Sequence, residues 1–330
     1  MPYNHTKLPC VRKTNFLDLK RFLSYLDGSP GKDAGIFKPM RKNDMKKMKT
    51  RRQLIQIAGA GAVASLITAA GSPIAAAQTN PTGKRKFEVG LASYSLREFN
   101  LDQTLAMTRR VGLKFIALKS VHLPLESSQA EIKAVAAKVK GAGLELYGGG
   151  VIYMKNEAEV NGAFDYAKAA GMKVIIAAPQ PELLPLVNKK VQEYGIKIAV
   201  HNHGPGDKTY PTPASVYEKI KNLDKRIGLC NDIGHTYRAG EDLAESVERF
   251  AERLFDVHIK DVVLTEGDKA GAKTVEVGRG SIDIPGFLRT LLKVGYAGVV
   301  AFEYEKDSAD PLPGLAESIG YVKGVLSAVS

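Results

Sequence analysis

From Phe87 onward, short apolar runs alternate along the chain with longer amphipathic runs. The short runs predict strands at 87–93, 113–119, 143–149, 173–178, 196–201, 226–232, 254–260 and 298–303. The longer runs predict helices near 101–111, 127–140, 157–170, 181–194, 213–222, 241–251, 284–294 and 313–327. Strands that alternate with helices indicate βαβ units and a parallel sheet. Eight such units in about 250 residues are typical of a (β/α)8 barrel, also called a TIM barrel.

The last four predicted strands each have two chemically different faces. One face carries mainly bulky apolar side chains: Ile196, Ile198, Val200, Ile227, Leu229, Phe255, Val257, Ile259, Val300 and Phe302. The other carries small or polar ones: Ala199, His201, His203, Gly228, Cys230, Asp232, Asp256, His258, Lys260, Val299, Ala301 and Glu303. We expect the first face to pack against helices and the second to line the barrel interior, opening at the C-terminal mouth.

A doubly wound open sheet is the alternative fold. That fold often carries a G-x-G-x-x-G turn after its first strand. Here the corresponding segment reads Ala92-Ser93-Tyr94-Ser95-Leu96-Arg97, which contains no glycine. The favoured fold is therefore α/β, a single TIM barrel preceded by a disordered leader and a signal peptide.

The first 77 residues read as a leader and an export signal. Arg51-Arg52 precede an uncharged run from Ile57 to Ala70, and the segment ends in Ala75-Ala76-Ala77. The run is shorter than the ~18–20 residues of a membrane span, and the small-residue ending is typical of a signal peptide. The arginine pair indicates the twin-arginine pathway and a periplasmic location. An Ala-rich basic helix is the alternative.

Three parts of the chain follow from this interpretation. Residues 1–47 form an N-terminal extension that we expect to be disordered, unless translation starts at Met45 or Met48. Residues 48–77 form the signal peptide, and residues 78–330 form the mature barrel, for which no stable membrane span is expected.

Charge and cysteine content narrow the function of the mature part. Residues 1–77 hold a net charge of +10 and residues 78–330 only +2, so the basic character belongs to the leader. We therefore expect no nucleic-acid partner. Cys230 is the one cysteine after residue 77, which excludes an intrachain disulfide there.

Polar side chains gather at the ends of the predicted strands. The five histidines after residue 77 all lie at or just beyond a strand end, and two carboxylates join them: His122, His201, His203, His235, His258, Asp232 and Glu303. Active sites of barrels are built at these ends. A single buried histidine is more often structural, but this set indicates a site. Imidazoles and carboxylates together suit one divalent metal, Mn, Zn, Co or Fe.

Lys260 and Cys230 lie on the same inward face as these residues. Lys260 follows His258 by two positions and could hold a developing oxyanion or a substrate hydroxyl. A salt bridge to Asp256 or Asp261 is the alternative. We interpret Cys230 as a small residue that packs in the interior.

Several motifs, in this order and spacing, resemble the xylose-isomerase-like (sugar phosphate isomerase/epimerase) superfamily, which also includes inosose dehydratase and endonuclease IV. They are Asp232-Ile-Gly-His235 with Arg238-Ala-Gly240, Val257-His-Ile-Lys-Asp261, Val277-Gly-Arg-Gly280 with Ile282-Asp283, and Phe302-Glu-Tyr-Glu305. The resemblance covers about residues 87–327.

The resemblance implies roles for individual residues. It places metal ligands at Asp232, His258 and Glu303, and a fourth at His201, where the family usually has glutamate. It also implies substrate contacts at Lys119, His122, His235 and Arg279. The segment Val200-His-Asn-His-Gly204 resembles the His-x-His stretch of inosose dehydratase-type members.

The chemistry implied is removal of a proton from a carbon beside a carbonyl of a small carbohydrate. Reprotonation makes the enzyme an isomerase or epimerase, which the family favours. Loss of a β-substituent, either water or an aglycone, makes it a lyase or dehydratase, which the histidine at position 201 favours. We expect Glu303 as ligand and base, with His201 or His203 as the partner acid/base.

Other functions stay open or are disfavoured. A non-catalytic sugar-binding barrel is a further alternative, whereas the near-neutral mature part argues against DNA repair of the endonuclease IV kind. Whether the sugar is phosphorylated, and whether the protein forms a homo-oligomer, are left open.

Overall fold

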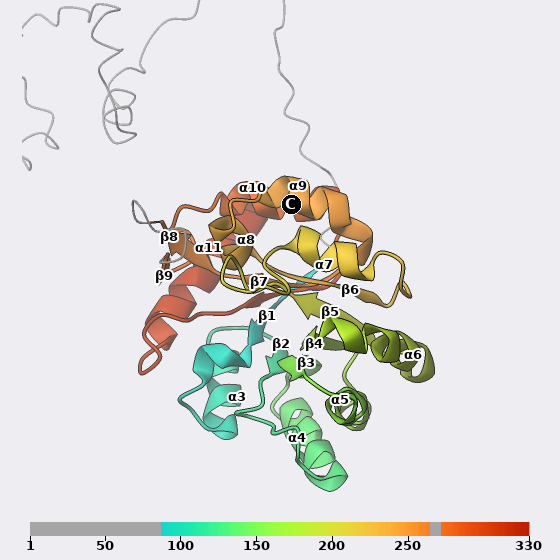
Figure 1. Ribbon diagram of the computed structural model, residues 1–330. Coiled ribbons are helices and arrows are strands. Elements are labelled where there is room, and N and C mark those ends of the chain that lie inside the picture. Colours follow the sequence, from blue (N-terminus) through green and yellow to red (C-terminus); the bar gives the residue numbers. More distant parts are fainter. Residues whose placement is uncertain (1–86, 265–271, 330) are drawn as a thin grey trace, which may run out of the picture. The chain divides into compact units, whose positions relative to one another are not determined.

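A computed structural model describes residues 87–264 and 272–329. The predicted leader and signal peptide lie outside the described residues. Eight parallel strands form a closed barrel in the order β1-β10-β7-β6-β5-β4-β3-β2, which confirms the predicted TIM barrel (Figure 1). The strands are β1 (Glu88–Ala92), β2 (Phe115–Leu118), β3 (Glu145–Met154), β4 (Val174–Pro179), β5 (Lys197–His201), β6 (Ile227–Asp232), β7 (Leu254–Ile259) and β10 (Val299–Phe302).

Helices surround the barrel (Figure 1). They are α3 (Leu101–Arg110), α4 (Gln129–Gly141), α5 (Glu157–Ala170), α6 (Leu184–Tyr194), α7 (Pro213–Ile220), α8 (Ile233–Arg238), α9 (Leu243–Phe250), α10 (Ile284–Lys293) and α11 (Leu312–Val329), with short 3-10 helices η2 (Ser93–Leu96), η3 (Pro181–Leu183) and η4 (Ala251–Arg253). Local sequence sets their ends. Ser128 and Glu131 form a capping box that begins α4, and Gly171 ends α5 with a φ of 70°.

The two faces of the strands pack in different layers, as predicted. Bulky side chains such as Ile198 and Val300 pack in the cluster beneath the helices, and small ones such as Ala199 and Ala301 pack in a second cluster inside the barrel. Phe255 is an exception, because it packs against the interior cluster.

A shift in register explains the position of Phe255. Leu229 pairs with Leu254 but Cys230 pairs with Asp256, so Phe255 is left between them. Its ring covers Gly228, where a Cβ atom would lie 2.6 Å from the ring and 2.1 Å from the Arg253 carbonyl oxygen. The missing side chain at Gly228 therefore makes room for this ring.

Four elements at the C-terminal mouth differ from the sequence prediction. β3 continues past residue 149 to Met154, and α8 directly follows β6. β8 (Asp261–Val263) and β9 (Lys273–Val275) form a small antiparallel pair after β7. The six residues of α8 and the three each of β8 and β9 are too few to show a clear period.

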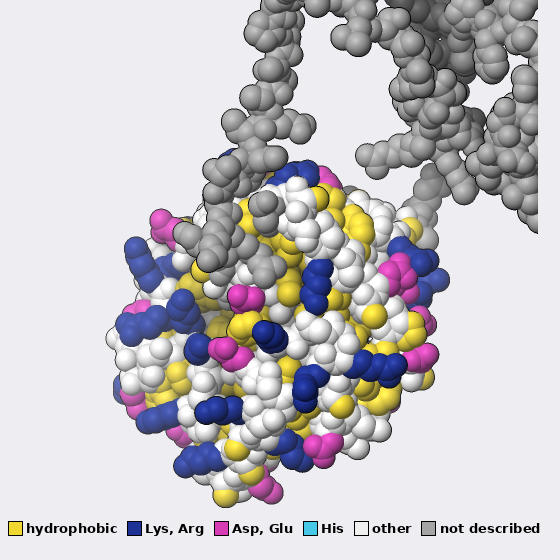
Figure 2. Space-filling model, turned by 180° about the vertical axis from the view of Figure 1, so that it is seen from behind, with side chains coloured by type: hydrophobic (Ala, Val, Ile, Leu, Met, Phe, Trp, Pro, Cys, Tyr) yellow, Lys and Arg dark blue, Asp and Glu magenta, His cyan; other side chains and the backbone are white. Residues whose placement is uncertain are grey.

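The surface charges agree with the near-neutral net charge of residues 78–330. Acidic and basic side chains are interspersed over the face seen in Figure 2. Within 87–264 and 272–329, the helices include none that is long and apolar enough to cross a bilayer.

Candidate metal centre at the barrel mouth

Four buried side chains from four neighbouring strands meet at the C-terminal mouth. His201 ends β5, Asp232 ends β6, His258 lies in β7, and Glu303 follows β10. Each offers one ligand atom, and these atoms all lie within 4.8 Å of one another. The structure thus brings together all four residues that the sequence suggests as metal ligands.

His258 lies between two carboxylates. Its Nε2 is 3.4 Å from Asp256 Oδ2, and its Nδ1 is 3.3 Å from Glu303 Oε2. Burial lowers the pKa of His258, but Glu303 and the two aspartates outweigh it and raise the pKa to about 9. A metal-bound histidine commonly donates its second N–H to a carboxylate. Asp256 can accept that bond, which leaves Nδ1 facing the cluster.

His201 contributes a ring that is neutral in this environment. Burial is the main reason that its pKa is lowered to about 3. Its Nε2 lies 3.2 Å from His258 Nδ1 and 3.5 Å from Asp232 Oδ2, while its buried Nδ1 has no hydrogen-bond partner. Metals bind neutral imidazole, so this ring is in the state that a ligand needs.

Lys260 adds a cation to the two carboxylates. Its Nζ lies 2.6 Å from Glu303 Oε2 and 2.9 Å from Asp232 Oδ2, and it also lies 2.9 Å from Glu305 Oε1. Burial lowers the pKa of Lys260, but the three carboxylates raise it well above its usual value. Lys260 therefore contacts the site rather than Asp256 or Asp261, the alternative partners considered from the sequence.

The Lys260 side chain packs directly against Gly234, where a larger residue would not fit. A Cβ atom at Gly234 would lie 2.5 Å from Cγ of Lys260. Because real carbon atoms do not approach so closely, a side chain at position 234 would push Lys260 away from the cluster. The glycine in Asp232-Ile-Gly-His235 is thus required sterically, because it leaves room for the Lys260 side chain.

The donor set fits one divalent metal. Two imidazoles and two carboxylates suit Mn, Zn, Co or Fe, and His201, Asp232, His258 and Glu303 would hold it. Cys230 also lies within reach of the two histidines. Its Sγ donates to Asp256 Oδ2 at 3.2 Å, and burial and Asp256 raise its pKa well above the usual value. Cys230 is therefore a neutral thiol in the interior.

Asn202 supports Asp232 and was not singled out from the sequence. The Asp232 backbone N–H donates to Asn202 Oδ1 at 3.0 Å, and Asn202 Nδ2 donates to Thr236 Oγ1 at 3.1 Å. Asp232 itself begins α8 by accepting the His235 N–H at 2.9 Å. These bonds hold the end of β6 in place beneath the cluster.

His203, His235 and Lys119 lie around the cluster. The His203 ring is 4.5 Å from the His201 ring and 6.2 Å from the His235 ring, between centroids. His235 Nε2 is 3.9 Å from Asp232 Oδ2. Lys119 donates to the Val151 carbonyl at 2.9 Å, and Glu303 is near enough to oppose the burial that lowers the Lys119 pKa.

His122 and Arg279 are not brought to the cluster. The His122 ring nitrogens contact Ser93 Oγ at 2.8 Å and Thr104 Oγ1 at 2.9 Å, so protein groups surround it. Arg279 pairs with Glu317 of α11, and 63% of its side chain is exposed. Their predicted substrate contacts stay predictions, and these placements do not favour them.

Two side chains at the mouth had no role in the sequence analysis. Tyr153 donates to or accepts from His203 Nε2 at 3.0 Å, and Glu305 accepts a bond from Lys260. Tyr153 was missed because the predicted third strand ended at 149, within the run Gly148-Gly149-Gly150. Glu305 carries a sequence signal, since it follows Glu303 by two residues.

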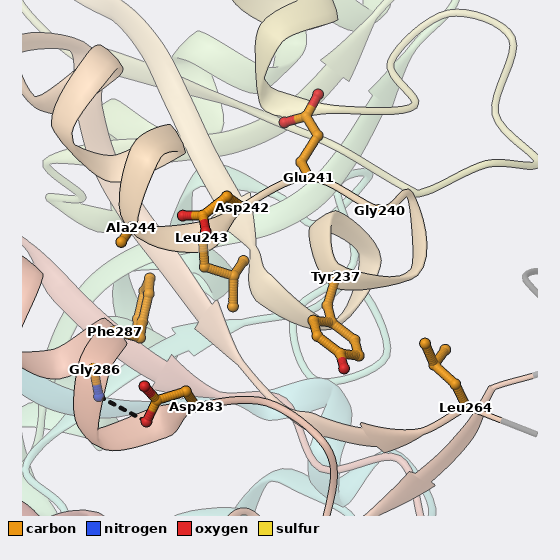
Figure 3. A pocket seen from close by; sticks show the side chains of 10 residues that line it. All are labelled: Tyr237, Gly240, Glu241, Asp242, Leu243, Ala244, Leu264, Asp283, Gly286 and Phe287. Atoms are coloured by element: carbon orange, nitrogen blue, oxygen red, sulfur yellow. Dashed lines mark hydrogen bonds between the residues drawn. The ribbon is translucent and has the colours of Figure 1, made fainter.

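A separate pocket of about 520 Å³ lies between α8, the start of α9 and α10 (Figure 3). Tyr237, Leu243 and Phe287 line it, with Asp283, whose carboxylate accepts the Gly286 N–H at 3.0 Å. It shares no residue with the four-ligand cluster. This pocket is therefore distinct from the candidate metal centre.

Comparison with known proteins agrees with this architecture. Residues 105–325 match the family described as xylose isomerase-like TIM barrel. The chain is 31% identical over 148 residues to the rhizopine catabolism protein MocC of Rhizobium meliloti, covering 41% of this chain and 43% of that protein. It is 27% identical over 165 residues to inosose isomerase of Bacillus licheniformis, covering 44% and 58%. It is 30% identical over 155 residues to inosose dehydratase of Mesomycoplasma hyopneumoniae strain 7448, covering 41% and 50%.

The matched segments span about half the length of these curated relatives. Among solved structures, the IOLI protein with a binding zinc atom has a TM-score of 0.60 at 21% identity, covering 74% of this chain and 98% of that one. L-ribulose 3-epimerase has a TM-score of 0.58 at 17% identity, covering 74% and 95%. At these identities the likeness concerns the fold. Since the family match covers most of the described chain, the protein belongs to the xylose isomerase-like TIM barrel family.

Proposed function

We propose that the protein is a divalent-metal-dependent isomerase or epimerase that transfers a proton next to the carbonyl of a keto-sugar. The observation that carries this proposal is the buried cluster of two histidines and two carboxylates at the barrel mouth, with the Lys260 ammonium against it. An inosose isomerase among the relatives supports the reaction class.

The metal, when bound by His201, Asp232, His258 and Glu303, would polarise substrate oxygens. A zinc-containing relative of the same fold supports this kind of site, and Mn, Zn, Co and Fe all suit its donors.

Glu303 is suited to act as the base. Burial raises its pKa, but Lys260 and His258 together lower it well below the usual value, so it is a carboxylate that can accept a proton. Its base strength is low while Lys260 donates to it. Lys260 Nζ donates to both Glu303 and Glu305. If a substrate oxygen replaces Glu303 as acceptor, Glu305 still holds Lys260 in place, and Glu303 is free to accept a proton.

His203 is better placed than His201 to be the partner acid/base. The His201 side chain is 3% exposed, and its Nε2 lies beside two cluster members, His258 Nδ1 at 3.2 Å and Asp232 Oδ2 at 3.5 Å. The His203 side chain is 20% exposed, with one nitrogen next to Asp207 and the other next to the Tyr153 hydroxyl. A proton can therefore reach His203 from solvent through these groups. We assign His201 to metal binding and His203 to proton transfer.

Elimination is the second candidate function. It begins with the same proton removal, after which the C–O bond to a β-substituent breaks and a C=C bond forms beside the carbonyl. The His203 and Tyr153 pair could supply the proton that the leaving oxygen needs. An inosose dehydratase among the relatives supports this outcome.

NMR of keto-sugars in D2O with purified, metal-analysed protein separates these functions. Exchange of the hydrogen next to the carbonyl for deuterium supports the proposal, whether or not an isomeric product accumulates. A new unsaturated ketone identifies elimination. Binding without any exchange, in a protein that contains no metal, would indicate a non-catalytic sugar-binding barrel and contradict it.

A further inference from the structure

A second pocket adjoins the proposed reaction site. It is open, has a volume of about 460 Å³, and lies between the loop that follows β2 and the first turns of α5. Leu125, Tyr153, Lys155, Asn156, Gly162 and Ala163 are among its lining residues. All of these elements lie at the C-terminal side of the barrel, where the candidate metal centre is built.

Tyr153 is the wall shared by the pocket and the reaction site. Its hydroxyl is 3.0 Å from His203 Nε2, and its ring lies nearly parallel to the His203 ring at 5.6 Å between centroids. Yet the residue is 52% exposed and lines the pocket. A substrate ring held beside His203 would therefore lie next to Tyr153, which also lines this pocket.

The lining chemistry suits a neutral ring. Leu125 and the exposed Tyr153 ring offer apolar surface, and Lys155 offers a polar group, whereas the Asn156 amide is bonded to Glu159 at the start of α5. Small-molecule sites commonly combine apolar walls with a few polar groups. The acidic Glu126 and Glu159 accompany Lys155, so no excess of positive charge favours a phosphate.

We propose that this pocket binds the aglycone ring of a glycoside whose keto-sugar ring lies at the metal centre. The inference rests on the proposed function and adds a substrate class to it: keto-glycosides with a ring aglycone are preferred over free keto-sugars and over methyl glycosides. Tyr153 then lies between the two subsites, with its hydroxyl bonded to His203 and its exposed ring available to the aglycone.

Gly162 allows the pocket to be filled without disturbing the fold. It is an exposed residue in the second turn of α5, and a Cβ atom there would meet nothing within 4 Å. Replacing a helical glycine with leucine also favours the helix. Gly162→Leu should therefore fold normally and occupy part of the pocket. Gly320→Leu in α11, where a Cβ atom likewise meets nothing within 4 Å, is the matched control.

The probes are glucosides oxidised to the ketone at C2, C3 or C4, the ring carbons that carry a secondary hydroxyl, each prepared as methyl and as phenyl glycoside. We expect the wild-type protein to have a kcat/KM at least about tenfold higher for the phenyl than for the methyl form of the accepted isomer. Gly162→Leu should lose this preference while keeping the methyl rate, and Gly320→Leu should behave as wild type.

Two results would overturn this inference while leaving the proposed function intact. One is equal use of methyl and phenyl glycosides by the wild-type protein, and the other is an equal fall for both probes in Gly162→Leu. If no keto-sugar shows C–H exchange or turnover, the proposed function fails. Ligand-observed NMR then still tests the pocket, because phenyl glycosides that bind wild type and Gly162→Leu alike contradict it.

Discussion

Glu303 lies beside two basic side chains, with Lys260 Nζ at 2.6 Å and His258 Nδ1 at 3.3 Å from its Oε2. Glu303→Gln keeps the shape of the side chain and one ligating oxygen but removes its charge and its proton affinity. We expect turnover to fall by ~10²–10⁴-fold, as on removal of a general base, while most of the metal is retained. Single-turnover assays together with metal analysis check this.

His201→Gln provides the comparison for Glu303→Gln. Because His201 is buried among cluster members, we expect this variant to lose metal and activity together. Near-normal turnover of metal-saturated Glu303→Gln would show that Glu303 is a ligand alone. The base would then have to be sought at His201, His203 or Lys260.

Substitution of Lys260 distinguishes metal binding from catalysis at the carboxylates that it contacts. Lys260→Met removes the ammonium that donates to Glu303 and lies beside Asp232, and it keeps a similar side-chain length. We expect metal affinity to stay the same or rise, because a competing cation is gone, and turnover to fall at least ~10²-fold. Metal titration and kcat measured on the same samples test this, and loss of both metal and fold would contradict it.

At the scale of elements, Asp261 holds the loop that follows β9. Its buried carboxylate accepts backbone N–H groups from four residues at 2.9–3.2 Å, Val262, Gly278, Gly280 and Ile282. Asp261→Ala leaves these donors without their partner. We expect the free energy of unfolding to fall by about 2–4 kcal/mol in urea denaturation.

Asp283→Ala is the matched control for Asp261→Ala. Asp283 accepts one exposed N–H, from Gly286, at the start of α10. Loss of such a cap costs about 1 kcal/mol. Equal destabilisation by the two substitutions would show that Asp261 is no more than a local cap.

At the scale of the whole molecule, a metal that joins four neighbouring strands should stabilise the barrel. A ligand at 100 times its Kd adds about 2.7 kcal/mol to the stability of the folded state. At about 2–4 °C per kcal/mol, chelation should lower the Tm by roughly 5–10 °C. Calorimetry before and after chelation, and after return of Mn, Zn, Co or Fe, measures this shift. Asp232→Ala should show no such response.

We propose that the protein is exported through the twin-arginine pathway, from the Arg51-Arg52 pair and the Ala75-Ala76-Ala77 ending. The mature protein should then begin at or near Gln78, as measured by the intact mass of material from the periplasm. A cytoplasmic protein that retains Met1 would contradict export, and lysine at both arginine positions should keep the precursor inside the cell.

The alternation of eight short apolar runs with eight amphipathic ones predicted the barrel, and the two unlike faces of its last four strands predicted a helix layer on one side and an interior on the other. Small inward residues such as Ala199 and Ala301 and polar ones such as His201 and Asp232 therefore marked both the core and the mouth. Only tertiary structure decided the rest. The direction of Lys260 depends on the space above Gly234, and the place of Tyr153 depends on the extension of β3 to Met154. Contacts between residues distant in the chain determine both positions, and the periodicity of a single strand does not indicate such contacts.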